Sequence, residues 1–375
     1  MSAPAPAPAL AALAGLPGMG PARLRAVLAR WPADEAWARI VRGDLDDGDA
    51  LAPAHVRSMW RAAASAVEVD DVARAHADAG VAVIAMGDDA YPAMLAEDPE
   101  PPPVLFVRGS LDALLTRRAA IVGTRRCTWS GRLVSRALGR ELAEAGVCVV
   151  SGLALGIDGE AHAGALEADG PGLPVGVVGT GLDVVYPRRH ARLWEAVAAA
   201  GALVSEYPLG TPVERWRFPA RNRIIAGLCE VLVVVESHAT GGSLHTVDAA
   251  LERDRTVLAV PGAVRSASSA GTNGLLAAGC PPCRDSRDVL VALGLTPTTS
   301  GAAGSASTAG DGADVAMPSD PEAARVLEAL GWEPATLDEL ADRLGVPLGP
   351  VAVHLTRLAN AGWVVQRAGW WERTR

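Results

Sequence analysis

The sequence predicts an α/β protein built on a Rossmann-like, doubly wound and mostly parallel sheet. Its short apolar runs, such as residues 231–235, are too short for a typical helix and too apolar for a sheet edge. Runs of this kind are typical of strands buried on both faces. Glycine turns and helical patterns follow them at the spacing of βαβ units. Ligands of such sheets bind beyond the carboxyl ends of the strands, where helices begin.

Residues 1–79 are predicted to form an N-terminal helical domain that resembles a SAM or helix-hairpin-helix domain. Residues 1–10 are rich in Ala and Pro, so we expect them to be disordered. The hairpin of the predicted motif is Leu16-Pro-Gly-Met-Gly-Pro21, whose backbone amides resemble those that grip a DNA phosphate. Because the hairpin has no basic residue and residues 44–49 are acidic, we favour a structural or protein-contact role over DNA binding.

Residues 80–295 are predicted to form the Rossmann-like domain. Strands at residues 81–86 and 104–107 are expected to flank the main sheet. The alternating core then has strands at residues 119–123, 147–151, 175–178, 202–205, 231–235 and 257–260. Helices are expected between these strands, including residues 128–145 and 219–228.

Residues 296–319 are rich in Gly, Ala, Ser and Thr, which predicts a flexible linker. Residues 320–375 then read as three helices and a hairpin, the pattern of a winged helix. A capping box formed by Thr336 and Glu339 begins the second helix. The third helix offers only His354 and Arg357 to a DNA groove, so we favour protein contact there.

The length of 375 residues predicts two or three domains. A formal net charge of -9 argues against a protein that coats nucleic acid with a generally basic surface, although local basic patches stay possible. The chain has no lysine, so every phosphate contact must come from planar Arg forks. Five cysteines and the lack of a long apolar run predict a cytoplasmic protein without membrane association. Cys280 and Cys283 have metal or redox spacing without further ligands, and we predict neither a metal nor a cofactor.

Arginines gather at one predicted helix start beyond a buried strand. Pro219 suits the first helical position, where its missing N–H costs nothing. The free N–H groups of that helix end favour an anion. Arg221 shares the inward face of the helix and is expected to form a pocket wall, whereas Arg217 and Arg223 are expected to be more accessible. We interpret this region as a phosphate-binding edge.

Two glycine turns are expected at the same edge. Gly123 and Arg125 follow one strand and are suited to holding a phosphate through backbone amides and a guanidinium. Gly241, Gly242 and Ser243 open a helix after another strand and predict a phosphate cradle. Aromatic residues interleaved with arginines, here Trp216 and Phe218, suit stacking on single-stranded nucleic acid, but burial in the core is an equal alternative.

Other polar residues favour structural roles. His162 lies within a predicted helix, and Asp158 and Asp183 suit a cap or turn better than general-base catalysis. No nucleophile and base occur together, so the sequence predicts a binding protein rather than an enzyme.

Several of these motifs resemble the DNA-processing protein A (DprA/Smf) family. They are Gly123-Thr-Arg125, Ser151-Gly-Leu-Ala-x-Gly156-Ile-Asp158 with Ala161-His162, Gly179-x-Gly181-Leu-Asp183 with Tyr186-Pro187, Ser205-Glu206-Tyr207, Phe218-Pro-x-Arg221-Asn222-Arg223-Ile-Ile and Ala259-Val-Pro261-Gly262. The resemblance implies a single-stranded DNA binder that helps to load the RecA recombinase in natural transformation and works as a homodimer through its Rossmann-like domain. It also implies a positive pocket that includes Arg125, Arg188 or Arg189, and the Arg221-Asn222-Arg223 segment. The chain departs from the family after the buried strand, where Gly241-Gly242-Ser243-Leu244-His245-Thr246 replaces the common Ser-Gly-Ser-Leu-Ile-Thr, and at His190, where Asn is usual.

We therefore predict sequence-independent binding of single-stranded DNA. The predicted contacts are Gly123, Arg125, Arg188, Arg189, Arg217, Phe218, Arg221, Asn222, Arg223, Gly241, Gly242 and Ser243. A competing hypothesis is a nucleotide phosphoribohydrolase of the lysine-decarboxylase-like Rossmann group, because Gly241, Gly242 and Asp248 match part of its motif. Leu244 and His245 break that motif. A third hypothesis is an assembly scaffold without affinity for nucleic acid.

Overall fold

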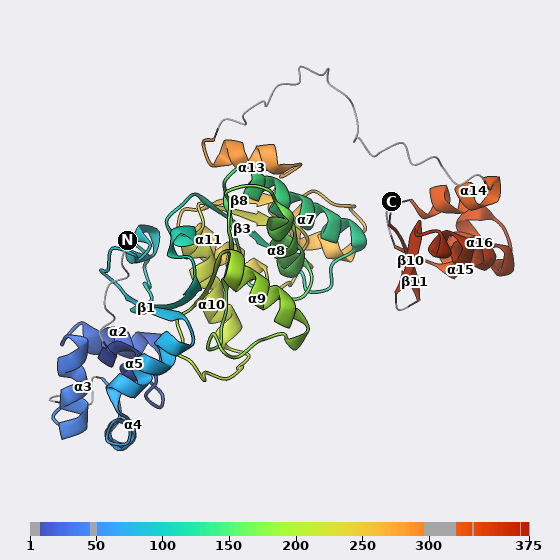
Figure 1. The fold of residues 1–375 in the computed structure, drawn as a ribbon. Helices are drawn as coiled ribbons and strands as arrows, with labels where there is room; N and C mark the ends of the chain where they lie inside the picture. Colours follow the sequence, from blue (N-terminus) through green and yellow to red (C-terminus); the bar gives the residue numbers. More distant parts are fainter. Residues whose placement is uncertain (1–7, 46–50, 296–319, 332–333, 368, 375) are drawn as a thin grey trace.

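The structure, a computed structural model, describes residues 8–45, 51–295, 320–331, 334–367 and 369–374 (Figure 1). An eight-stranded sheet lies at its centre, in the order β1-β2-β6-β5-β4-β3-β7-β8. The strands are β1 (Val81–Ala85), β2 (Val104–Gly109), β3 (Arg118–Val122), β4 (Cys148–Ser151), β5 (Pro174–Val177), β6 (Ala202–Ser205), β7 (Val231–Val234) and β8 (Thr256–Ala259). The predicted linker at residues 296–319 lies outside the described residues, and the other domain limits stay predictions.

The predicted doubly wound sheet is confirmed. Strands β3 to β8 pair in parallel, whereas β1 pairs with β2 and β2 with β6 in antiparallel fashion, so the first two strands flank the parallel part as expected. The chain runs from β3 outward through β4, β5 and β6, and then returns to place β7 on the other side of β3. The strand order therefore reverses between β3 and β7, which is where such sheets bind ligands.

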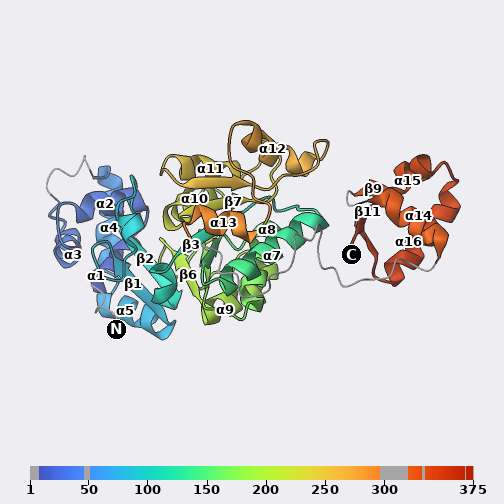
Figure 2. The same cartoon turned by 90° about the horizontal axis from the view of Figure 1, so that it is seen from above.

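Helices cover both faces of the sheet (Figure 2). Alternate residues of each strand point to opposite faces, so Ile121 packs with one cluster and Val122 with another. One face is covered by α7 (Trp129–Glu144), α8 (Ile157–Glu167), α9 (Ala191–Ala200) and α13 (Ser286–Ala292). The other face is covered by α6 (Ala93–Ala96), α10 (Arg217–Leu228) and α11 (Leu244–Leu251), with α12 (Ala270–Ala277) beside β8.

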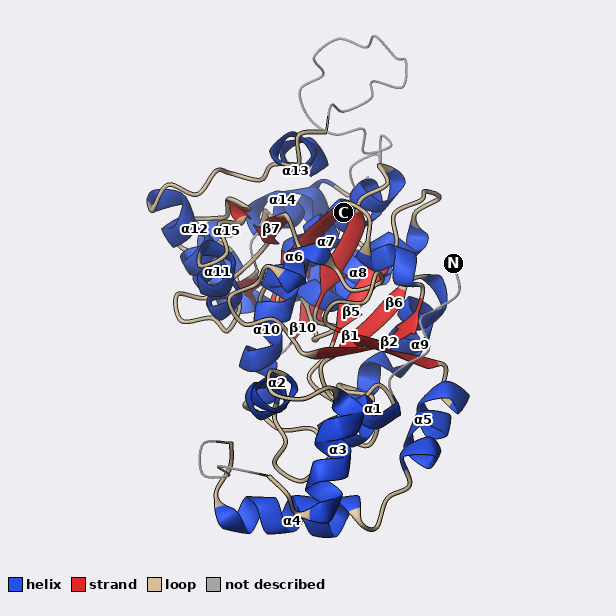
Figure 3. Ribbon diagram, turned by 90° about the vertical axis from the view of Figure 1, so that its left-hand side faces the viewer, coloured by secondary structure: helices blue, strands red, loops and turns tan. Residues whose placement is uncertain are grey.

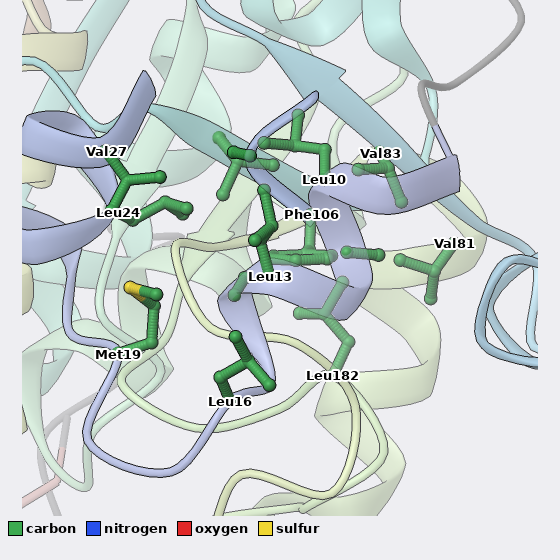
Figure 4. Packing of buried hydrophobic residues seen from close by; sticks show 14 of the residues in the cluster. Leu10, Leu13, Leu16, Met19, Leu24, Val27, Val81, Val83, Phe106 and Leu182 are labelled. Atoms are coloured by element: carbon green, nitrogen blue, oxygen red, sulfur yellow. The ribbon is translucent and has the colours of Figure 1, made fainter. Parts of the chain in front are cut away.

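Among the described residues, five helices form the N-terminal part, at the β1–β2 end of the sheet (Figure 3). They are α1 (Pro8–Ala14), α2 (Pro21–Leu28), α3 (Ala33–Arg42), α4 (Ala54–Ala64) and α5 (Val69–Asp78). The expected disorder of residues 8–10 is wrong, because Leu10 is buried in a cluster that extends to Phe106 of β2 (Figure 4). The predicted hairpin joins α1 to α2, and its Pro17 carbonyl accepts a 2.9 Å hydrogen bond from the indole of Trp60. Residues 1–7 and 46–50 lie outside the described part.

The C-terminal part has the predicted winged-helix elements. They are α14 (Pro321–Leu330), β9 (Ala335–Thr336), α15 (Leu337–Leu344), α16 (Leu348–Asn360), β10 (Val364–Arg367) and β11 (Trp370–Arg373). The capping box at Thr336 and Glu339 is confirmed. Strand β9, which sequence analysis missed, has two residues and completes a three-stranded sheet with the hairpin. Across the described residues, no helix has the length and apolar character needed to cross a membrane.

Candidate nucleic-acid interface

A groove of about 750 Å³ opens at the carboxyl ends of β3 and β7, where the strand order reverses. Five segments line it: the turn after β3, the loop between β4 and α8, the loop after β5 that carries Tyr186, the start of α10 and the loop before α11. Of the predicted contacts, it brings together Gly123, Arg125, Phe218, Arg221, Asn222, Gly241, Gly242 and Ser243.

Helix α10 supplies one wall of this groove. It begins at Arg217, two residues before the predicted start at Pro219. Pro219 is then the third helical residue, where an N–H still has no partner within the helix, so its ring does not end the helix. Phe218, Asn222 and Ile225 line the groove because they are separated by four and three residues and share a face.

Arg221 forms the floor of the groove, as the predicted pocket-wall role requires. Its side chain is buried, and its Nη1 donates hydrogen bonds to the carbonyls of Gly152, at 2.8 Å, and Val177. These carbonyls lie at the ends of β4 and β5, so the guanidinium joins two strand ends. Burial lowers the pKa of Arg221 to about 10, and Asp158 opposes this shift. Arg221 therefore stays charged at neutral pH while being fixed in place.

Asp158 and Asp183 have the predicted structural roles. The buried Asp158 accepts a 3.1 Å hydrogen bond from the amide of Gly152, and burial raises its pKa against the opposing effect of Arg221. Asp183 accepts hydrogen bonds of 2.9 and 3.0 Å from the amide of Gly210. Each carboxylate thus fixes a loop.

Three side chains form what we call the groove cluster: Arg125, Tyr186 and Phe218. The rings of Tyr186 and Phe218 lie 5.2 Å apart, and the Arg125 guanidinium lies 5.5 Å from the centre of the Phe218 ring. Phe218 is half-buried, whereas Tyr186 and Arg125 are exposed. An aromatic pair with an adjacent cation offers both a stacking face and a charge to one nucleotide.

Exposed cationic groups line the groove or follow one of its lining residues in the chain. Arg125, Arg126 and Arg215 line the groove, whereas Arg188 and Arg189 lie two and three residues after Tyr186 and are not among the lining residues. All five are exposed, and within the described residues their guanidinium groups form no ion pair. Sequence analysis did not select Arg126 and Arg215. Arg126 is adjacent to Arg125 and Arg215 is two residues from Arg217, and this proximity to predicted contacts could have indicated them.

Besides Arg188 and Arg189, two further predicted contacts lie outside the groove lining. Arg223 was expected to be accessible, but its side chain is only 13% exposed and pairs with the buried carboxylate of Glu206. Arg217 is also 13% exposed, and its Nη1 donates a 2.6 Å hydrogen bond to the Pro212 carbonyl. Neither shares the helical face of Phe218 and Asn222, so neither lines the groove.

The glycine turns contribute close packing as well as backbone donors. A Cβ at Gly123 would lie 2.6 Å from Ile157 Cγ1, so only glycine fits between the turn and α8. Gly242 is exposed and lines the groove, and a Cβ added there would have no atom within 4 Å, so its backbone is open to the groove. Ser243 is buried, and its hydroxyl donates to Ser237 at 2.9 Å, so it orders the loop.

His238 and His245 line the groove, whereas His162 and His190 lie outside its lining and have structural positions. His162 is fully buried in α8, and burial lowers its pKa to about 3, so it is neutral at physiological pH. His190, one of the departures from the family pattern, has its Nδ1 2.9 Å from the Leu153 carbonyl and donates to it. Among the described residues, no group of three or more His, Cys, Asp or Glu side chains is arranged to hold a metal ion.

Comparison with models of known protein families identifies the family of this chain. A family model described as DNA recombination-mediator protein A matches residues 82–294, which is more than half of the sequence. The chain belongs to this family. A second model, the DprA winged helix domain, matches residues 312–369. This assignment confirms the resemblance and does not favour the phosphoribohydrolase hypothesis.

Relatives of this recombination-mediator family cover most of the chain. Protein Smf of Escherichia coli is 39% identical over 288 residues, which span 76% of this chain and 75% of that protein. The structure also resembles DNA processing protein A from Streptococcus pneumoniae, with a TM-score of 0.61 and 30% identity over 75% of this chain and 95% of that one. A structure of DNA processing protein A from Helicobacter pylori, described by its single-stranded DNA binding mode, gives a TM-score of 0.52 and 27% identity over 57% and 95% of the two chains.

Proposed function

We propose that this protein binds single-stranded DNA without sequence preference and acts as a recombination mediator. The groove cluster carries this proposal, because it places a stacking face and a guanidinium side by side at the ligand edge of the sheet. Stacking on aromatic rings accepts any base, since every base has a π-face. The surrounding open arginines supply contacts to the phosphate backbone, which carry no sequence information.

The same arrangement favours single strands over duplexes. In a duplex, both faces of each base are covered by its neighbours, so Phe218 and Tyr186 find no ring to stack on. Phosphate contacts alone would still attract duplex DNA, but less tightly and with greater sensitivity to salt.

The family assignment and the relative from Helicobacter pylori support a wider role, in which the protein loads RecA onto incoming single strands in natural transformation. We further propose that it works as a homodimer through the Rossmann-like domain and acts without catalysing a reaction. Within the described part of the chain, no nucleophile with an activating base lines the groove.

A mobility-shift experiment tests the binding. Single-stranded DNA, duplex DNA and RNA of one sequence are compared at two salt concentrations. We expect the single-stranded DNA to bind most tightly and a scrambled sequence to bind equally well. Equal affinity for duplex would contradict the stacking argument, and release of free base from nucleoside monophosphates would contradict the non-catalytic role.

A further inference from the structure

A second recess of about 750 Å³ lies on the other side of the α10 start from the groove. It is formed by the turn between α1 and α2, the loop after β6 and the first residues of α10. Its charged lining residues are Arg23 and Arg217, and no acidic residue is among the described residues that line it. The proposed function so far gives this recess no role.

The start of α10 separates the recess from the groove. Trp216 and Phe218 are two positions apart, so their side chains leave the helix about 200° apart around its axis. Phe218 therefore points into the groove, and Trp216 points into the recess. Trp216 is 55% exposed, an unusual exposure for so large an apolar ring. One helix end thus presents an aromatic residue to each side.

The recess repeats the chemistry of the groove cluster. The rings of Tyr207 and Trp216 lie 6.4 Å apart in an edge-to-face arrangement, and the Arg217 guanidinium lies 4.9 Å from the first and 5.2 Å from the second. We call Tyr207, Trp216 and Arg217 the recess cluster. Each cluster has two aromatic rings and one guanidinium, and each takes one aromatic residue from the start of α10.

Polar contacts hold the recess cluster in place. The Trp216 indole donates a hydrogen bond to Glu214, and Arg217 donates to the Pro212 carbonyl and lies 3.4 Å from Glu214. These contacts use the edges of the indole and the guanidinium. The Arg217 guanidinium also lies over the Trp216 ring, so the ring is held in place before a ligand arrives. An ordered, exposed ring loses little conformational entropy on binding.

We propose that the recess cluster is a second base-stacking site, which takes a nucleobase of the same single strand after the strand leaves the groove around the start of α10. This proposal rests on the proposed function. Because Arg217 is already engaged with Glu214, stacking on Trp216 is the main contribution of the site.

A length series of oligothymidylates tests the proposal. We expect the affinity of the wild-type protein to rise in a step at the length at which a strand filling the groove first reaches the recess. Trp216→Ala should remove that step, with a loss of between about 5-fold and 100-fold for long strands. For strands shorter than the step length, Trp216→Ala should lower the affinity by less than about twofold, because these strands do not reach Trp216. Trp216→Phe should restore most of the step.

A second measurement locates the base directly. A long strand that carries 5-iododeoxyuridine is cross-linked by light to the full-length protein, and the modified peptide is identified by mass spectrometry. We expect adducts at both Trp216 and Phe218, and only at Phe218 for short strands. An unchanged melting temperature of Trp216→Ala shows that the exposed ring was not needed for folding.

The outcomes separate the two proposals. If short strands bind and Trp216→Ala equals wild type at every length, the second stacking site is wrong and the proposed function stands. If strands of no length bind to the wild-type protein, both proposals fail. A step that survives in Trp216→Ala, with cross-links elsewhere, also overturns the inference.

Discussion

Removing Arg125 tests how the groove binds DNA. Three exposed arginines line the groove and two more follow Tyr186 in the chain, and neutralising one phosphate of a single strand contributes about -0.7 to the slope of log K against log salt. With five contacts the wild-type slope is about -3.5, so affinity falls about 100-fold between 50 and 200 mM salt. Arg125→Ala should give a slope of about -2.8. If the two lines meet at 1 M salt, they differ about eightfold at 50 mM.

Fluorescence anisotropy with a labelled oligothymidylate at four or more salt concentrations measures these slopes. The matched control is Arg287→Ala, because Arg287 is an exposed arginine of α13 away from the groove and its loss changes the net charge equally. Phe218→Ala gives the complementary result: lower affinity at every salt concentration with an unchanged slope. A slope for Arg125→Ala equal to that of the control would refute the phosphate contact.

Three further predictions concern the supports of the groove. Gly152→Ala should destabilise the fold and weaken DNA binding together, because the added Cβ would lie 2.6 Å from Nη2 of Arg221; thermal melting and anisotropy measure both effects. Arg223→Ala should lower the free energy of unfolding by about 3 kcal/mol through the unpaired carboxylate of Glu206, without changing the affinity of the folded protein. The free energy of unfolding should fall as the pH drops from 6.5 toward 3 because of His162. Its pKa is lowered to about 3 in the folded state, so in that range only the unfolded state gains the proton. Denaturant unfolding should show a loss of about 2 kcal/mol at pH 5.

Each of these has a control. Gly242→Ala adds a methyl group where nothing lies within 4 Å, so it should leave the melting temperature unchanged. For the ion pair, a loss of DNA affinity by folded Arg223→Ala would contradict the structural role. His162→Gln should unfold with a shallower pH dependence between pH 6.5 and 3 than the wild type. Equal slopes would show that another group titrates there.

Local sequence patterns were sufficient to predict the sheet. A strand buried on both faces, such as β7, is apolar at every position, and this does not depend on where its neighbours come from in the sequence. The turns after β3 and β7 could also be recognised locally, because glycines follow both of these apolar strands in the sequence. The parallel arrangement then requires both turns to lie at one edge, so the groove could be placed before its shape was known.

Local sequence patterns could not predict hydrogen bonds and ion pairs between residues that are far apart in the sequence. The buried Glu206 that engages Arg223 is 17 residues away, and the Gly152 carbonyl that engages Arg221 is 69 residues away. Helix geometry correctly placed Arg221 and Arg223 on different faces of α10. It could not show that the face carrying Arg223 would lie against a carboxylate. The start of α10 was missed because Pro219 is tolerated at the third helical position as well as at the first.

The absence of lysine explains why composition was a poor guide to the site. Arg has to serve both as a structural donor and as a ligand for DNA, and its planar fork suits each role. The structure divides the arginines by their partners: Arg223 and Arg253 pair with the buried carboxylates of Glu206 and Asp98, whereas the arginines at the groove border stay open. At physiological salt, charges more than about 8 Å from a phosphate are largely screened. A protein with a net charge of -9 can therefore bind a polyanion, because the open arginines act over that distance and the distant carboxylates do not.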